Sequence, residues 1–162
     1  MKKILLLLLC STFFFLTIVT PAQAASPVHD SRNVSDYIET LDDGSYFHVV
    51  ISEDINTSFA RSALTKSGSR TVTYHVADGT AVWQFTLNGT FQFTPGVSSS
   101  CISGSYSINI YDSSWENTSA SSSTSGNQAI GNATFIKKVL FITTQTENVS
   151  VALACDSYGN LS

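Results

Sequence analysis

Basic side chains are scarce in this chain and are spread along its length. Among 162 residues there are 8 lysines and arginines against 12 aspartates and glutamates, and charged residues make up 12% of the sequence. Proteins that bind nucleic acid or an anionic membrane surface usually gather lysine and arginine into a patch. Because no such patch occurs, neither nucleic acid nor an anionic membrane surface is an expected partner.

Familiar catalytic and metal-binding patterns are also missing. The sequence has no GxSxG or SxxK motif, and its three histidines, at positions 29, 48 and 75, lack the HxH or HxxxH spacing of metal ligands. We therefore predict no catalytic residue, no metal ligand and no cofactor. Two alternatives stay open, since acidic turns such as Asp42-Asp43 and the one at Asp156 could bind calcium, and a pair of carboxylates could serve a hydrolase.

The first 25 residues have the pattern of a secretory signal peptide. Two lysines precede an apolar run over residues 4–19, which Pro21 ends, and Ala22-Gln23-Ala24 then provides a signal peptidase site. We predict that residues 1–24 are removed by cleavage between Ala24 and Ala25, which leaves no membrane span. The apolar run is about as long as a short membrane span, so an uncleaved anchor is the alternative.

Cysteine occurs only three times, and no two cysteines form the CxxC spacing of redox and zinc centres. Cys10 belongs to the predicted signal peptide. Its removal leaves Cys101 and Cys155 in a secreted protein, where a single pair most simply forms a disulfide bond. We therefore predict a Cys101–Cys155 disulfide.

The chain after the signal peptide has the length of one ordinary domain. Residues 25–36 contain few apolar side chains and are predicted to be a flexible lead-in. Residues 37–162 are predicted to form one domain. No segment in this range has a helical hydrophobic period of useful length, whereas several short segments alternate between apolar and polar side chains.

The clearest strands lie between residues 71 and 93. Asp78-Gly79 is a typical two-residue type I′ hairpin turn, and it would pair Val76 with Ala81, Tyr74 with Trp83, and Val72 with Phe85. Asn88-Gly89 also has turn chemistry, but the alternation runs through it without a shift. We therefore predict one long strand over residues 81–93, in which Gly89 marks a bulge or a close approach.

Other strands are indicated on both sides of this pair. A strand is predicted at residues 46–51, with residues 37–41 as its partner or a turn of helix, and residues 55–70 are predicted to be mainly loop. Later strands are predicted at residues 105–111, 129–136, 138–143 and 148–156, and the polar residues 112–128 are predicted to form a long connection or a ragged edge. About seven strands separated by turns are typical of an all-β, antiparallel β-sandwich, loosely immunoglobulin-like.

Two aromatic residues form the candidate binding surface. Trp115 lies in polar sequence, and Tyr111 has the outward parity of the strand before it. Exposed aromatic pairs bind sugars and protein partners in many β modules. The alternative is that Trp115 folds back and covers an edge of the sandwich.

Several short motifs along the chain form a pattern of turns, aromatic strands and cysteines: Asp43-Gly44-Ser45-Tyr46, Asp78-Gly79 with Trp83, Gly89-Thr90-Phe91, Cys101, Ser114-Trp115 and Leu153 to Asn160. In this pattern the chain resembles a group of small exported β proteins of Gram-positive bacteria. Thr94-Pro95-Gly96 departs from the Tyr-Asn-Gly expected of that group. The resemblance implies a disulfide-linked β domain and no particular activity.

Together these features predict a secreted protein, extracellular or bound to the cell wall, that acts without catalysis as a binding module for an extracellular protein or glycan. One alternative is a secreted toxin, bacteriocin or pore former, because the Ser/Thr-rich residues 112–128 lie beside alternating strands. A hydrolase is a second alternative. The long strand could pair with another chain at an exposed edge, so the oligomeric state stays open.

Overall fold

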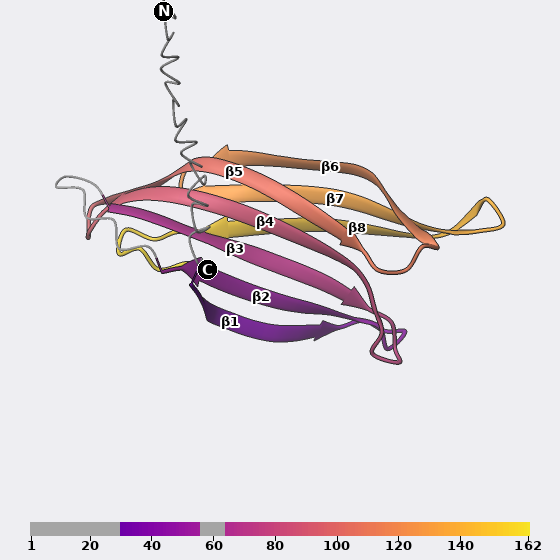
Figure 1. The fold of residues 1–162 in the computed structure, drawn as a ribbon. Coiled ribbons are helices and arrows are strands. Elements are labelled where there is room, and N and C mark those ends of the chain that lie inside the picture. The colour runs from indigo at the N-terminus through magenta and orange to yellow at the C-terminus, as the bar shows by residue number, and fades with distance from the viewer. Residues whose placement is uncertain (1–29, 56–63) are drawn as a thin grey trace, which may run out of the picture.

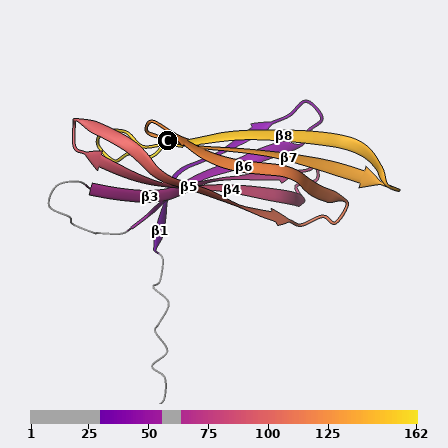
Figure 2. The same cartoon turned by 90° about the horizontal axis from the view of Figure 1, so that it is seen from above.

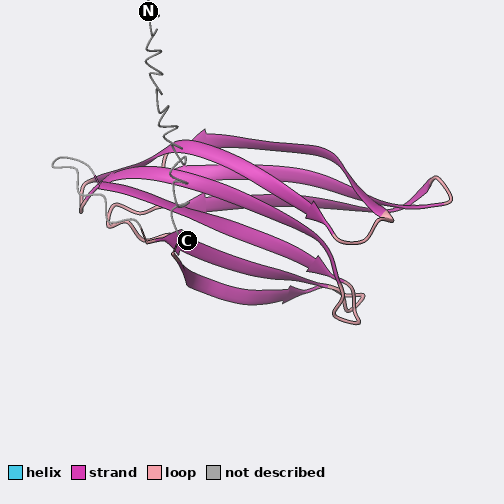
Figure 3. Cartoon of the chain, viewed as in Figure 1, coloured by secondary structure: helices cyan, strands magenta, loops and turns pink. Residues whose placement is uncertain are grey.

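The computed structural model describes residues 30–55 and 64–162, and every regular element within them is a β-strand (Figures 1 and 3). The strands are β1 (Ser31–Thr40), β2 (Tyr46–Asp54), β3 (Leu64–His75), β4 (Ala81–Thr94), β5 (Ser98–Ile110), β6 (Trp115–Ser125), β7 (Gln128–Val139) and β8 (Ile142–Ala154). The predicted all-β class is confirmed, with eight strands in the described part in place of about seven.

The strands form two antiparallel sheets. Strands β1 to β5 make a five-stranded sheet in chain order, and β6, β7 and β8 make a three-stranded sheet. Each strand therefore pairs with the strand that follows it, except where the chain passes from β5 in the first sheet to β6 in the second. Figure 2 shows the three-stranded sheet running along the five-stranded one.

The apolar core joins side chains from both sheets. Trp83 of β4 stacks on Phe135 of β7, with ring centroids 4.0 Å apart and planes within 6° of parallel. Tyr74 of β3 packs on Trp83 as well, at 5.3 Å. Both rings of the cross-sheet pair are fully buried. The buried side chains on one face of β3 and β4 therefore contact side chains of the three-stranded sheet in one core.

The β3–β4 hairpin confirms the predicted register and corrects the turn. Tyr74 pairs with Trp83 and Val72 with Phe85, as predicted, but His75 rather than Val76 pairs with Ala81. Only Gly79 has a positive φ, of 89°, whereas a type I′ turn needs two such residues. The turn is one residue longer than predicted, because the Val76 N–H bonds the Thr80 carbonyl at 3.1 Å and encloses residues 77–79. Within this loop the Asp78 carboxylate accepts the Thr80 N–H at 2.8 Å.

The prediction of one long strand through Gly89 is confirmed, since β4 runs without a turn to Thr94. Gly89 pairs with Gly68 of β3 on one side and with Gly104 of β5 on the other. A Cβ at position 89 would lie 2.7 Å from the ring of Phe91. The glycine therefore marks a close approach, which was one of the predicted explanations.

Two strands were only partly predicted from the sequence. Residues 31–36 of the predicted flexible lead-in belong to β1, and most of residues 112–128, predicted as a connection or a ragged edge, are β6, an edge strand of the three-stranded sheet. Both strands are largely exposed and polar, so they lack a strong alternating pattern. Their backbones are held by pairing with β2 and β7, and pairs such as Asp36–His48, 2.7 Å apart, add side-chain contacts.

Near the C-terminus, the predicted boundaries are wrong. A strand predicted at residues 138–143 is instead a turn at residues 140–141 between two longer strands, β7 and β8. Val139 and Ile142 pair across this turn. The sequence pattern misleads here because the turn itself is apolar, and an apolar run usually indicates a strand.

The predicted signal peptide and its cleavage site between Ala24 and Ala25 lie outside the described residues. Within residues 30–55 and 64–162, no helix has the length and hydrophobicity needed to cross a membrane.

Candidate functional site

An open groove lies where β1, β2 and β3 of the first sheet meet β8 of the second. Its volume is about 160 Å³. Small-molecule sites commonly measure about 300–1,000 Å³, so this groove suits a short segment of a larger ligand. We call it the β8 groove, and it is lined by Tyr37, Glu39, Phe47, Val49, Arg70, Val72 and residues 148–151.

One wall of the β8 groove is the outer edge of β8, with which no other strand of the described chain pairs. At the C-terminal end of this edge, Ala154 exchanges two backbone hydrogen bonds with Ser162, of 2.8 and 3.0 Å. Backbone groups of a strand point to the same edge at every second residue. The backbone N–H and C=O groups of Ala152, Ser150 and Asn148 therefore face the groove.

Arg70 of β3 lies at the point where this edge becomes open. One guanidinium nitrogen, Nη1, donates to the carbonyl of Ala152 at 2.8 Å, and Nη2 donates to the hydroxyl of Tyr37 at 2.5 Å. Its Nε–H is buried and has no hydrogen-bond partner among the described residues. None of the ion pairs between described residues involves Arg70. The cation is thus held by neutral oxygens and is free to pair with a carboxylate of a ligand.

The opposite end of the groove is acidic. Glu39 of β1 pairs with Phe47 of β2. Arg70 of β3 pairs with Ile51, which lies four residues further along β2 on the same face of the sheet. Four residues of strand separate the two levels, which is roughly 13 Å at about 3.3 Å per residue. The groove therefore has a positive and a negative end at a spacing that a short extended peptide can span.

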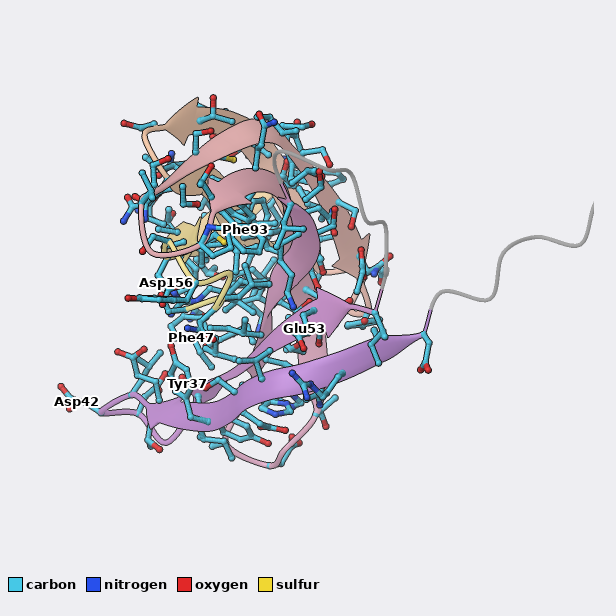
Figure 4. All side chains as sticks on the ribbon, turned by 90° about the vertical axis from the view of Figure 1, so that its left-hand side faces the viewer. Tyr37, Asp42, Phe47, Glu53, Phe93 and Asp156 are labelled. Carbon is cyan, nitrogen blue, oxygen red and sulfur yellow. The ribbon has the colours of Figure 1, made fainter. Side chains whose placement is uncertain are left out.

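Apolar side chains form the floor between these two charges. Val49 and Val72 are buried and Phe47 is half-buried. In Figure 4, Phe47 lies between β1–β2 and the remaining strands. A ligand in the groove would thus bury apolar side chains on the floor while its charged groups reach the two ends.

The predicted aromatic surface is not formed. Trp115 is only 3% exposed, and its ring meets that of Tyr74 edge-on at 5.6 Å, so it belongs to the core. Its position near the turn between the sheets allows it to fold inward, which was the alternative considered above. Tyr111 is 54% exposed, and its hydroxyl donates to the Gln84 side chain at 3.3 Å. Trp115 therefore cannot present a face for stacking.

The predicted disulfide is also absent, because Cys101 and Cys155 are free thiols. The Cys101 Sγ–H donates to the Ser103 carbonyl at 3.3 Å, and the Cys155 Sγ–H donates to the Asp156 carbonyl at 3.5 Å. Each thiol is thus directed toward its own backbone. Burial is the main cause that raises the pKa of both thiols, and the charge of Asp156 and then the neighbouring Cys101 add to the rise at Cys155.

We expect both thiols to react slowly with iodoacetamide in the folded protein, Cys155 more slowly than Cys101. A raised pKa lowers the thiolate fraction at a given pH, and Cys155 is buried whereas Cys101 is half-buried. Mass spectrometry after unfolding without reductant should find both cysteines alkylated. An unfolded protein that resists alkylation until it is reduced would contradict this expectation.

The acidic turns that were candidate calcium sites serve as turn caps. The Asp43 carboxylate accepts hydrogen bonds from the N–H and hydroxyl of Ser45, which lower its pKa. Asp156 likewise accepts the N–H groups of Tyr158 and Asn160, and the bonds to Asn160 contribute most to lowering its pKa. In the part of the chain that the structure describes, no cluster of three or more His, Cys, Asp or Glu side chains could hold a metal ion.

Sequence reasoning missed the residues of the β8 groove. Arg70 fell in a segment predicted to be mainly loop, and Glu39 in one whose structure was left open. A single arginine carries no motif, and its place beside β8 depends on a tertiary contact between the two sheets, its bond to the Ala152 carbonyl. The sequence did offer one indication of this site: Arg70 is a cation that directly precedes the alternating strand predicted from residue 71.

Comparisons with protein-family models, with curated proteins and with solved structures found no match to this chain. The function of the β8 groove is therefore argued from its own geometry and charges.

Proposed function

We propose that this protein is a secreted, non-enzymatic β-sandwich module that binds an extended segment of a partner protein in the β8 groove. The segment would lie along the outer edge of β8 and add a strand to the three-stranded sheet. An acidic group of the segment, a side chain or a terminal carboxylate, would pair with Arg70. The observation that carries the proposal is the unpaired edge of β8 that ends at an arginine without a carboxylate partner among the described residues.

An extended peptide fits the groove for three reasons. Strand addition at an open edge uses main-chain hydrogen bonds for affinity, and pockets for alternate side chains provide specificity. The open backbone groups at Ser150 and Asn148 lie on one edge of β8, where such hydrogen bonds can form. The charges of Arg70 and Glu39 add a direction, because they favour a segment that is acidic at one end and basic at the other.

A glycan is a weaker candidate for the same surface. Sugar-binding sites on β modules typically offer an exposed aromatic face, and Trp115 is buried. The groove itself contains Tyr37 and Phe47 as its only aromatic rings. Of these, Phe47 is half-buried, and Tyr37 is 40% exposed with its hydroxyl bonded to Arg70, so the groove offers one partly exposed ring for a sugar.

Selection from a displayed library of random peptides would test the proposal. We expect the selected peptides to share one acidic residue or a free C-terminal carboxylate. They should slow hydrogen exchange at the Ser150 and Asn148 amides, because those amides would become paired. Arg70→Gln should weaken their binding by about tenfold or more, since it removes a charge-assisted hydrogen bond.

Arg32→Gln is the matched control, because Arg32 is also an arginine but pairs with Glu53, away from the groove. It should leave peptide binding unchanged. Peptides that bind equally well to the Arg70→Gln protein, or whose protection maps away from β8, would contradict the proposal. Thermal unfolding of both variants would distinguish a lost contact from a lost fold.

A further inference from the structure

The tip of the β7–β8 hairpin holds the two most exposed large apolar side chains in the described part of the chain. Val139, Leu140, Phe141 and Ile142 follow one another and are 49%, 86%, 97% and 68% exposed. The hairpin extends past the ends of the neighbouring strands (Figure 1). Single exposed apolar residues are common on soluble proteins, but a contiguous projecting group indicates a contact site.

The backbone of this tip is strained. Leu140 and Phe141 have φ values of 48° and 69°, and they are the only residues other than glycine with positive φ among those described. A two-residue turn of this kind strongly favours Asn-Gly, because a Cβ is unfavourable in that conformation. Gly44 and Gly79 occupy the positive-φ positions of two other turns in this chain. Two bulky apolar residues at such a turn, against the backbone preference, point to a function of their side chains.

Basic residues lie directly behind the apolar tip. Lys137 and Lys138 immediately precede Val139, the last residue of β7, and no acidic residue occurs between them and Glu147 on β8. Lys138 pairs with Glu116 of β6 at 2.5 Å. Lys137 lies close enough to Asp112 for its charge to help lower the pKa of that carboxyl, although hydrogen bonds from Ser114 are the main cause, so both lysines have an acidic neighbour. Val139 is the one strand residue between Lys138 and the turn at Leu140–Phe141, so Lys138 lies roughly 7 Å along the hairpin from Leu140 at about 3.3 Å per residue.

We propose that the β7–β8 tip inserts into the surface of a phospholipid bilayer that contains anionic lipids. The four apolar side chains would enter the boundary between headgroups and acyl chains, and the two lysines would lie at the level of the headgroup phosphates. A projecting tip needs no complementary pocket in order to be buried in acyl chains. The shape and the order of charge and apolar residues along the hairpin therefore favour a bilayer over a protein pocket.

This local arrangement is an exception to the expectation drawn from composition. The scarcity of lysine and arginine predicts no anionic membrane partner for the chain as a whole. The tip combines two lysines with a continuous apolar group, and interfacial binding depends on that combination more than on net charge. The proposal does not depend on the β8 groove, whose ligand is a separate matter.

Co-sedimentation with vesicles would test the proposal. The protein, collected from the culture medium of a secreting host, would be mixed with vesicles of equal parts phosphatidylcholine and phosphatidylglycerol. We expect the parent protein to sediment with them and the double variant Leu140→Asn, Phe141→Gly to bind about tenfold less or weaker still. Because Asn-Gly suits the turn, this variant should unfold at a higher temperature than the parent.

Two further variants locate the effect. Val97→Ser changes another exposed valine in a turn and should leave vesicle binding unchanged. Phe141→Trp should show a blue shift of its emission on vesicle addition and quenching by brominated lipid, since the original tryptophans are buried. A parent protein that stays in the supernatant, or a double variant that binds like the parent, would overturn the proposal. Tip-dependent binding to a soluble protein without vesicle binding would overturn it as well, and would assign the tip to a protein pocket.

Discussion

Trp83→Ala is expected to lower the free energy of unfolding by about 3–5 kcal/mol, the usual cost of removing a large buried aromatic side chain. Trp83 is fully buried and connects both sheets, because it stacks on Phe135 at 4.0 Å and on Tyr74 at 5.3 Å. Its removal would leave a cavity between the sheets that stiff β-strands cannot close. Urea unfolding followed by circular dichroism would measure the change.

Trp83→Phe distinguishes loss of packing from loss of polar contacts. The Trp83 Nε1–H is buried without a hydrogen-bond partner among the described residues, so phenylalanine removes an unsatisfied donor. We expect this variant to lose less than half as much stability as Trp83→Ala. Tyr111→Ala, at an exposed ring, should change stability little. A Trp83→Ala protein as stable as the parent would contradict the two-sheet core.

The sequence specifies the central strands well because their side chains alternate strongly. Phe85, Leu87 and Phe91 alternate with polar residues, and that pattern predicts both the β3–β4 register and the uninterrupted β4. Buried strands of this kind carry their own structural signal, because a shift of one residue would place each of these side chains in water.

The edge strands carry no comparable signal. In β1, all residues except the half-buried Ser35 are exposed, and β6 consists mainly of serine, threonine and asparagine. Their structure comes from backbone pairing with a neighbour, which a local pattern cannot show. The β8 groove is lined partly by β1, so a site that depends on an edge strand is hard to find from sequence alone.

The number of cysteines and the predicted secretion of the chain did not suffice to predict whether a disulfide forms. An even number of cysteines in a secreted chain indicates a disulfide. The number alone does not show whether the two thiols point toward each other. Cys101 N–H bonds the Gly126 carbonyl and Cys155 N–H bonds that of Asn127, so the two cysteines flank one turn. The topology brings them to the same end of the fold, where each Sγ contacts a backbone carbonyl and no disulfide joins them.

Gly68→Ala is expected to lower the free energy of unfolding by about 2–3 kcal/mol, at the upper end of the cost of overpacking a core. A Cβ at this position would lie 2.5 Å from the carbonyl oxygen of Ser52 and 2.3 Å from Cδ1 of Leu161. The Leu161 side chain can turn away, but the Ser52 carbonyl belongs to the paired backbone of β2 and cannot. Alanine would otherwise stabilise a strand slightly relative to glycine, so the sign of the change tests the packing.

Gly104→Ala is the matched control, since Gly104 occupies the same row of the sheet and a Cβ there would meet only ordinary contacts of 3.4 Å or more. It should keep or slightly increase stability in urea unfolding. Displacement of Leu161 in Gly68→Ala should also release Ser162 from Ala154, so the Ala154 amide should exchange faster. Equal stability of the two variants would show that Gly68 does not hold the C-terminus against β8. Leu161 and Ser162 cover the C-terminal end of the outer edge of β8. If Ser162 leaves Ala154 as expected, the unpaired part of this edge becomes longer at that end.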